Sequence, residues 1–330
     1  MSPTKRLVSA IALALLWACS RGSHRPESDS AASRAAATAS GSSGSNTSPN
    51  KLVAPTRLLS LPVSAYSIVL GLDGELAYLL TRNAAYRLAA DRPPQRIELD
   101  LGIGPVLADS GIVFWSKGTI WNASKDGASV WRLATLSRQP EYFVASSAGI
   151  AWLDRAADGL FRIQSLGGQK PRVLVADQGE ISALNMVHEW VFFVQRAKDN
   201  SWRIGRVHVA HGEPEYTVSR TGPTPALLTG TEDVVFYDME RSEIRQLTPD
   251  LKSEHVLLKD FVCSPICEAT NLYCGRVEGL FEVLADSRKT RFLGNVRRET
   301  ITLIRANSKQ VVWAVDTGPD QLAIDMLPVQ

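Results

Sequence analysis

Seven short apolar segments, each centred on an aromatic residue, recur at a nearly constant spacing along this chain. The steps between successive aromatic residues are 36, 38, 40, 44, 37 and 40 residues. Segments such as "GIAWLDR" and "DVVFYD" are rich in β-branched and aromatic residues, which favour strands. The seven aromatic residues are Tyr78, Phe114, Trp152, Phe192, Phe236, Tyr273 and Trp313.

Each aromatic segment has further strand-like runs around it. One run precedes it, as in "SIVLGL", and two follow it after turn residues, as in "AAYRLAA" and "QRIELDL". Every unit is therefore predicted to be a four-stranded antiparallel meander. Because no extended helical periodicity competes after residue 50, we expect an all-β fold. Units of about 40 residues with four strands are typical of β-propeller blades.

The two ends of the repeat predict how the ring closes. The last unit, from Thr300, contains only three strand-like runs, whereas the leading stretch "TRLLSLPV", residues 56–63, belongs to no unit. We expect this leading stretch to supply the missing outer strand of blade seven, which removes an open seam. The prediction is a β-propeller domain over residues 51–330 with seven blades, six or eight blades being the alternatives.

The repeats resemble those of seven-bladed propellers of the YWTD, NHL and WD40 type over residues 56–330. The segments "AWLD" and "VFYD" approach the YWTD pattern, although no unit carries it intact and no WD dipeptide recurs. The resemblance therefore concerns architecture and implies no particular ligand.

The N-terminus has the layout of a secretory signal peptide. A basic "MSPTKR" is followed by twelve largely apolar residues, which rise about 18 Å as a helix and fall short of the roughly 30 Å bilayer core. The run ends at "LWAC", which resembles the bacterial lipobox, with Leu16 three residues before Cys19. The resemblance implies cleavage after residue 18 and lipidation of Cys19. An ordinary signal peptide with an incidental cysteine is the alternative.

Residues 20–50 predict a disordered tether after a lipidated Cys19. They contain ten Ser, six Ala and three Gly, and no Val, Ile, Leu, Met, Phe, Tyr or Trp. Such a segment buries too little apolar surface to offset its ordering entropy. As a flexible coil it reaches roughly 30 Å. The expected organisation is a signal peptide at 1–18, the lipidated cysteine and tether at 19–50, and the propeller.

Chemistry-bearing residues are scattered along the predicted inner strands, and we assign no catalytic residue, metal ligand or cofactor from the sequence. Since metal sites and acid/base catalysis need converging groups, polar turn residues are the favoured interpretation. His208 and His211 lie three residues apart at a strand end, where that spacing is not metal-like. The scattered residues are Asp73, Asp109, Glu141, His188 and Glu268.

Three cysteines cluster in the sixth unit, within "CSPICEATNLYC". Cys267 is expected on the inner strand and Cys274 on the next, so that a tight hairpin would place them opposite each other within disulfide range. Cys263 is the alternative partner of either residue. A disulfide suits an oxidising envelope compartment, and a zinc site is the rival hypothesis.

Charge and composition limit the classes of function. Without Lys5 and Arg6 of the signal peptide, the chain has 34 basic and 34 acidic residues, which argues against nucleic-acid binding. We expect the chain to be a membrane-anchored module of the cell envelope that binds an unknown protein or small molecule. In layout it is similar to envelope propeller lipoproteins, including the propeller subunit of the outer-membrane barrel assembly machinery. A propeller lyase, lactonase or hydrolase is the alternative. Candidates for an exposed aromatic patch are Trp115, Trp121, Trp131, Trp190 and Trp202.

Overall fold

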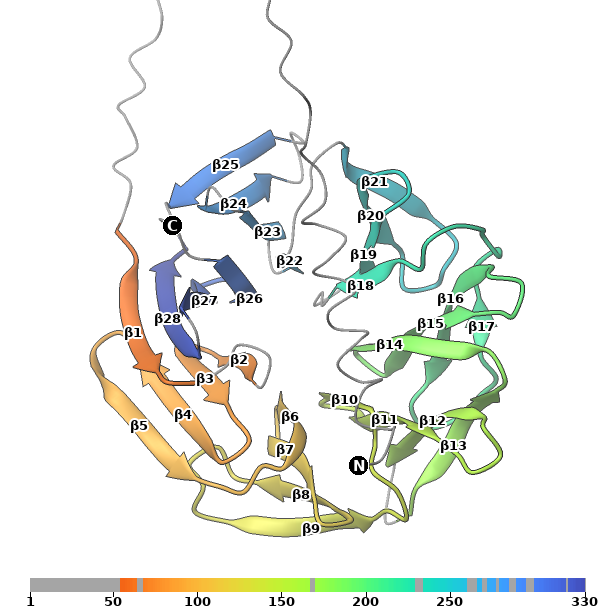
Figure 1. Cartoon of the computed structure of the whole chain (residues 1–330), viewed down its shortest axis with the longest axis horizontal. Helices are drawn as coiled ribbons and strands as arrows, with labels where there is room; N and C mark the ends of the chain where they lie inside the picture. The colour runs from red at the N-terminus through yellow and green to blue at the C-terminus, as the bar shows by residue number, and fades with distance from the viewer. Residues whose placement is uncertain are drawn as a thin grey trace, which may run out of the picture. The chain divides into compact units, whose positions relative to one another are not determined.

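Seven four-stranded antiparallel sheets follow one another around a ring, which confirms the predicted seven-bladed β-propeller (Figure 1). The computed structural model describes residues 54–63, 68–166, 170–228, 234–259, 266–268, 272–276, 279–284, 289–294, 300–318 and 320–329. Every regular element within these ranges is a strand.

The inner and second strands of the blades correspond to the first two runs of each repeat. The seven inner strands, which surround the ring centre in Figure 1, are β2 (Val69–Asp73), β6 (Ile103–Ala108), β10 (Tyr142–Ser146), β14 (Glu180–Val187), β18 (Ala226–Leu228), β22 (Ile266–Glu268) and β26 (Thr300–Ala306). The seven second strands, each carrying one aromatic residue of the repeat, are β3 (Leu76–Leu80), β7 (Gly111–Ser116), β11 (Gly149–Arg155), β15 (Trp190–Arg196), β19 (Val234–Asp238), β23 (Leu272–Arg276) and β27 (Gln310–Gly318).

The third and outer strands complete the blades, numbered one to seven from β2. The third strands are β4 (Ala84–Ala89), β8 (Thr119–Ala123), β12 (Phe161–Leu166), β16 (Trp202–His208), β20 (Glu243–Leu247), β24 (Gly279–Leu284) and β28 (Gln321–Pro328). The outer strands of blades one to six are β5 (Arg92–Glu98), β9 (Val130–Thr135), β13 (Arg172–Asp177), β17 (Glu215–Tyr216), β21 (Glu254–Lys259) and β25 (Lys289–Gly294).

The outer strand of blade seven comes from the other end of the repeat region. It is β1 (Thr56–Leu61), which pairs antiparallel with β28 from Thr56 opposite Met326 to Leu61 opposite Leu322. The first and last described segments thus share one sheet, as the incomplete last repeat predicts.

The core lies between neighbouring blades, and this position explains the continuous apolar runs of the second strands. Along β15, Val191 and Phe193 pack with residues of blade three. Phe192 and Val194 instead pack with residues of blade five. Because side chains alternate along a strand and both faces of this sheet are buried, all four positions are apolar. Each of these side chains is 0% exposed.

Candidate functional site

The antiparallel meander divides the connections between two faces of the ring. The face of the ring where the inner strands begin is called here the entry face. It carries the connections from each outer strand to the next inner strand, such as residues 178–179, and the turns between second and third strands, such as residues 197–201. The opposite face, called the exit face, carries the turns that follow the inner strands. Loops at such sheet ends are where scaffolds commonly place binding residues.

The polar residues noted on the inner strands are divided between the two faces of the ring. Asp73, Asp109, His188 and Glu268 all lie where inner strands end, at the exit face, whereas Glu141 precedes β10 at the entry face. They also come from five different blades.

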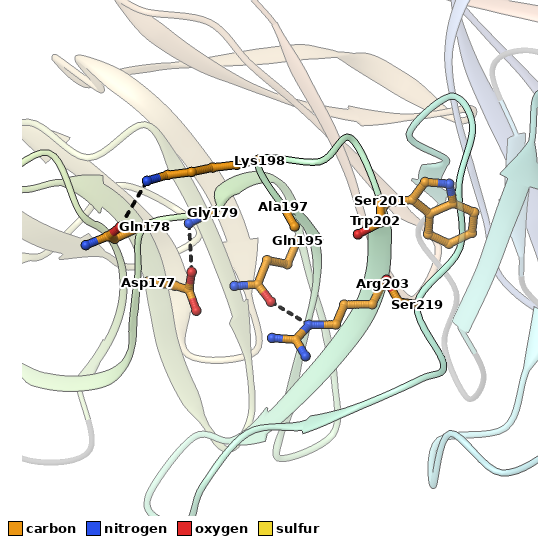
Figure 2. Close-up of a pocket in the computed structure, with 10 residues that line it drawn as sticks. All are labelled: Asp177, Gln178, Gly179, Gln195, Ala197, Lys198, Ser201, Trp202, Arg203 and Ser219. Atoms are coloured by element: carbon orange, nitrogen blue, oxygen red, sulfur yellow. Dashed lines mark hydrogen bonds between the residues drawn. The ribbon is translucent and has the colours of Figure 1, made fainter.

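A pocket opens at the entry face beside blade four, with a volume of about 500 Å³ (Figure 2). Its walls come from the connection between β13 and β14, from the turn between β15 and β16, and from the segment after β17. The lining residues are Asp177, Gln178, Gly179, Gln195, Ala197, Lys198, Ser201, Trp202, Arg203 and Ser219. Most of the lining residues are polar in type, and they include two basic side chains and one carboxylate.

A β-bulge in the segment that continues β17, the outer strand of blade four, forms one wall of this pocket. The Thr217 amide donates to the Ile204 carbonyl (2.9 Å), and the next backbone bonds join Trp202 and Arg220 in both directions at 2.7 and 2.8 Å. Two residues, Val218 and Ser219, therefore stand opposite the single residue 203, which is the arrangement of a bulge. Val218 is pushed outward and is 84% exposed.

Arg203 is held in this pocket from two directions. Its Nε–H donates to Oε1 of Gln195 at 2.7 Å, and its guanidinium carbon lies 3.6 Å from the centroid of the Tyr216 ring. Burial raises the pKa of the Tyr216 hydroxyl, the Arg203 charge lowers it in part, and Asp177 adds to the rise. The phenol therefore stays neutral at physiological pH, presenting an uncharged ring to Arg203.

The other charged groups of the pocket are tied to its rim. The Lys198 Nζ donates to Oε1 of Gln178 at 3.3 Å, and the backbone amide of Gly179 donates to Oδ1 of Asp177 at 2.7 Å. Figure 2 shows the Gln195 amide between the Asp177 carboxylate and the Arg203 guanidinium. No ion pair joins Asp177 to Arg203 among the described residues.

His208 and His211 lie together at the exit face. Their rings are stacked, with centroids 4.1 Å apart and planes inclined by 15°, and the Ala210 amide donates to Nδ1 of His208 at 3.2 Å. Nitrogen lone pairs lie in the ring planes, so parallel stacked rings do not converge on one metal ion. In the described ranges, no group of three or more His, Cys, Asp or Glu side chains is arranged to hold a metal.

The five tryptophans considered for a surface patch differ in exposure. Trp131 is exposed, at 41%, and lies on β9 beside Val130, at 47%. The expectation is wrong for Trp202, which is 3% exposed and packs against Phe236 with ring centroids 6.4 Å apart. Its indole fills the space between blades four and five because the even-numbered side chains of β16 face that way. The other three, Trp115, Trp121 and Trp190, are partly buried.

The hairpin of β22 and β23 is out of the register that the disulfide hypothesis needs. Cys274 lies opposite Ile266, and Cys267 lies opposite Tyr273, so the two cysteines do not face each other. Cys274 is fully buried and disulfide-bonded. Its partner falls outside the residues whose side chains are described, as do Cys263 and the predicted lipidation site Cys19.

The pocket is not predictable from the repeat pattern. Gln195, Arg203 and Tyr216 lie on three different strands, and nothing in a single run marks them as neighbours. The one available signal was the 44-residue step from Phe192 to Phe236, the longest in the repeat. The bulged residues Val218 and Ser219 lie within this longest unit.

Comparison with known proteins identifies the fold and no family. Neither a known family profile nor a curated protein sequence matches the chain. Among solved structures, the AfRom2 CNH domain is similar with a TM-score of 0.56 and 6% identity, over 84% of this chain and 100% of that one. A chain of a nidogen/laminin complex matches with a TM-score of 0.42 and 18% identity, over 57% and 78% respectively. At 6% identity, the first likeness shows the fold alone.

In the described part of the chain, no helix has the length and apolar character needed to cross a membrane.

Proposed function

We propose that this chain is a lipoprotein of the cell envelope whose β-propeller binds a protein or small-molecule partner. The observation that carries the binding role is the pocket of about 500 Å³ at the entry face, one wall of which is the bulge at Val218 and Ser219. Bulges are enriched beside functional sites, where they redirect side chains.

The proposed anchor depends on the sequence around Cys19. Twelve largely apolar residues end at "LWAC", and a segment free of large apolar side chains follows. Acyl chains on Cys19 would each bury many methylene groups, at about 0.8 kcal/mol per group, and give stable attachment without a transmembrane helix.

Fractionation of cells expressing the Cys19→Ala variant tests the anchor. We expect the wild-type chain in the membrane fraction, labelled by an alkyne fatty acid, and the variant unlabelled and released. Ser20→Ala is the matched control and should behave as the wild type. If the Cys19→Ala variant stays membrane-bound after high-salt washing, the lipoprotein assignment is wrong.

Capture from solubilised envelope tests the binding role at the pocket itself. Ser219→Trp places a bulky ring on an exposed pocket residue, and Ser129→Trp places the same ring on an exposed turn outside the pocket. We expect any reproducible partner to be lost from the first variant and retained by the second. Equal capture by both variants would exclude this pocket as the binding site.

A further inference from the structure

Arg203 has no carboxylate partner among the described residues, in contrast to several arginines in and beside blade four. Arg206 forms an ion pair with Glu215 at 2.8 Å, Arg245 forms one with Glu243 at 2.8 Å, and Arg220 is paired with Glu254. Within the part of the chain that the structure describes, no acidic side chain forms an ion pair with Arg203.

The Arg203 guanidinium is nevertheless fixed in orientation. Gln195, whose Oε1 accepts the Nε–H, is 4% exposed and held within β15. Tyr216, on which the guanidinium stacks, is itself braced by Phe193, with ring centroids 5.7 Å apart at 87°. Ordering this arginine therefore costs little further entropy when a ligand binds, because its conformation is already restricted.

The contacts that hold Arg203 determine which ligand group its guanidinium can bind. Since Nε is occupied by Gln195, the edge formed by the two Nη atoms is the one that remains to fork onto a planar pair of oxygens. A carboxylate matches that edge with two parallel hydrogen bonds. Lys198 adds a second positive charge at the rim, and no carboxylate among the described residues neutralises it.

The balance of charge in the pocket favours a carboxylate over phosphate. Arg203 and Lys198 contribute two positive charges and Asp177 one negative charge, so the lining is net positive by one. A singly charged carboxylate matches this balance, whereas a phosphate dianion would carry excess charge beside Asp177. The hydroxyl of Ser219 supplies a further neutral polar group.

We infer that the blade-four pocket binds a carboxylate group, with Arg203 as the bidentate partner and Lys198 as the rim cation. The inference rests on the proposed binding function and gives the chemistry of its ligand. The carboxylate belongs either to a small organic acid or to an acidic side chain or C-terminus of a peptide. These sources share one recognition chemistry and are separated by the probes below.

Calorimetric titration of the purified full chain in low salt tests the inference. The probes are propionate, an acetylated and amidated tetrapeptide containing one Glu, its Gln counterpart, the same Gln peptide with a free C-terminus, and inorganic phosphate. We expect one or more of the three carboxylate probes to bind at least tenfold more tightly than the capped Gln peptide. Binding by propionate indicates a small acid, and binding by a peptide probe indicates the corresponding peptide carboxylate.

Variants assign the effect to the pocket. Arg203→Gln should weaken carboxylate binding at least tenfold, and Arg203→Lys should recover only part, because lysine cannot form the bidentate fork. The matched control is Arg162→Gln, which removes an arginine paired with Asp158 on blade three. Should Arg203→Gln fail to fold, Lys198→Gln carries the test, with an expected severalfold loss.

The outcomes separate this inference from the proposed function. Equal binding by wild type and Arg203→Gln, no binding of any carboxylate, or tighter binding of inorganic phosphate would each overturn the carboxylate inference. Binding of the capped Gln peptide at equal strength would overturn it as well and leave the binding role intact. Retention of Cys19→Ala in membranes would overturn the anchor alone.

Discussion

Arg57 on β1 donates a hydrogen bond through Nη2 to Oδ2 of Asp325 on β28 at 3.0 Å, across 268 residues of sequence. Asp325 lies opposite the aromatic Trp313 on β27 and is 6% exposed. Blade six has the same arrangement, in which Arg291 on the outer strand holds Glu282 on the third strand. The N-terminal strand therefore occupies the position of a regular outer strand and makes the same charge contact.

Removal of Arg57 is expected to weaken the closure of the ring. The Arg57→Ala variant leaves the buried Asp325 carboxylate without this partner, and we expect the free energy of unfolding to fall by about 1–3 kcal/mol. Urea denaturation of the purified chain measures the loss as a lower midpoint at unchanged slope.

An exposed pair provides the control for this measurement. Arg96 and Glu98 pair on the surface with side chains 55% and 69% exposed, so Arg96→Ala should change stability by no more than about 0.5 kcal/mol. If the two variants unfold at the same urea concentration, the contact between Arg57 and Asp325 does not stabilise the closure.

Asp154 should make stability depend on pH in the opposite sense to most carboxylates. Burial raises the pKa of Asp154, and the hydrogen bond from Gln164 lowers it in part. The folded state therefore retains the proton to higher pH than the unfolded state, so this group's contribution to stability decreases as pH rises above about 4. We expect Asp154→Asn to be more stable than wild type at pH 7, with the difference vanishing toward pH 3.

Unfolding measured between pH 3 and 7.5 tests this expectation, and Asp199 gives the contrast. A hydrogen bond from Ser201 lowers the pKa of the exposed Asp199, so its contribution is present above the unfolded pKa and is lost as pH falls. Asp199→Asn should accordingly show no gain at pH 7. If Asp154→Asn changes the free energy of unfolding by the same amount at every pH, burial of the charged carboxylate is not the cause of the stability difference.

Gly205 leaves room for the aromatic side chain that supports the pocket. A Cβ at this position would lie 2.4 Å from Cζ of Phe193, whose ring braces Tyr216. Gly205→Ala should therefore destabilise the chain by about 1–3 kcal/mol through overpacking. Phe193→Leu shortens the obstructing side chain. The double variant should therefore lose less free energy of unfolding, measured by denaturant titration, than the sum of the losses in the two single variants. Additive effects would argue against this steric contact.

Non-reducing peptide mapping should find one linked cysteine pair that contains Cys274. Since Cys267 is one residue out of register with Cys274, we expect Cys263 to be the partner. Cys267→Ser should keep the cross-link, and Cys263→Ser should lose it. Three thiols open to alkylation in the unfolded, unreduced chain would exclude any such bond.

The strand pattern was predictable because it is local and repeated. The aromatic residues Tyr78 to Trp313 all lie on second strands, and the spare stretch at Thr56 closes blade seven. A continuous apolar run in a strand reports directly on burial of both sheet faces between blades. The register of the short hairpin at Cys267 was less predictable, because a shift of one residue leaves the local composition unchanged.

The sequence by itself determined the propeller repeat, the strand order and the closing strand, since each follows from repeated hydrophobic patterning, and it favoured seven blades over six or eight. Only the tertiary structure decided that Val218 and Ser219 bulge opposite Arg203 and that Gln195 and Tyr216 hold its guanidinium. It also decided that Trp202 turns into the core. These relationships depend on cross-strand register and on the packing of neighbouring blades, which are non-local interactions that no single segment encodes.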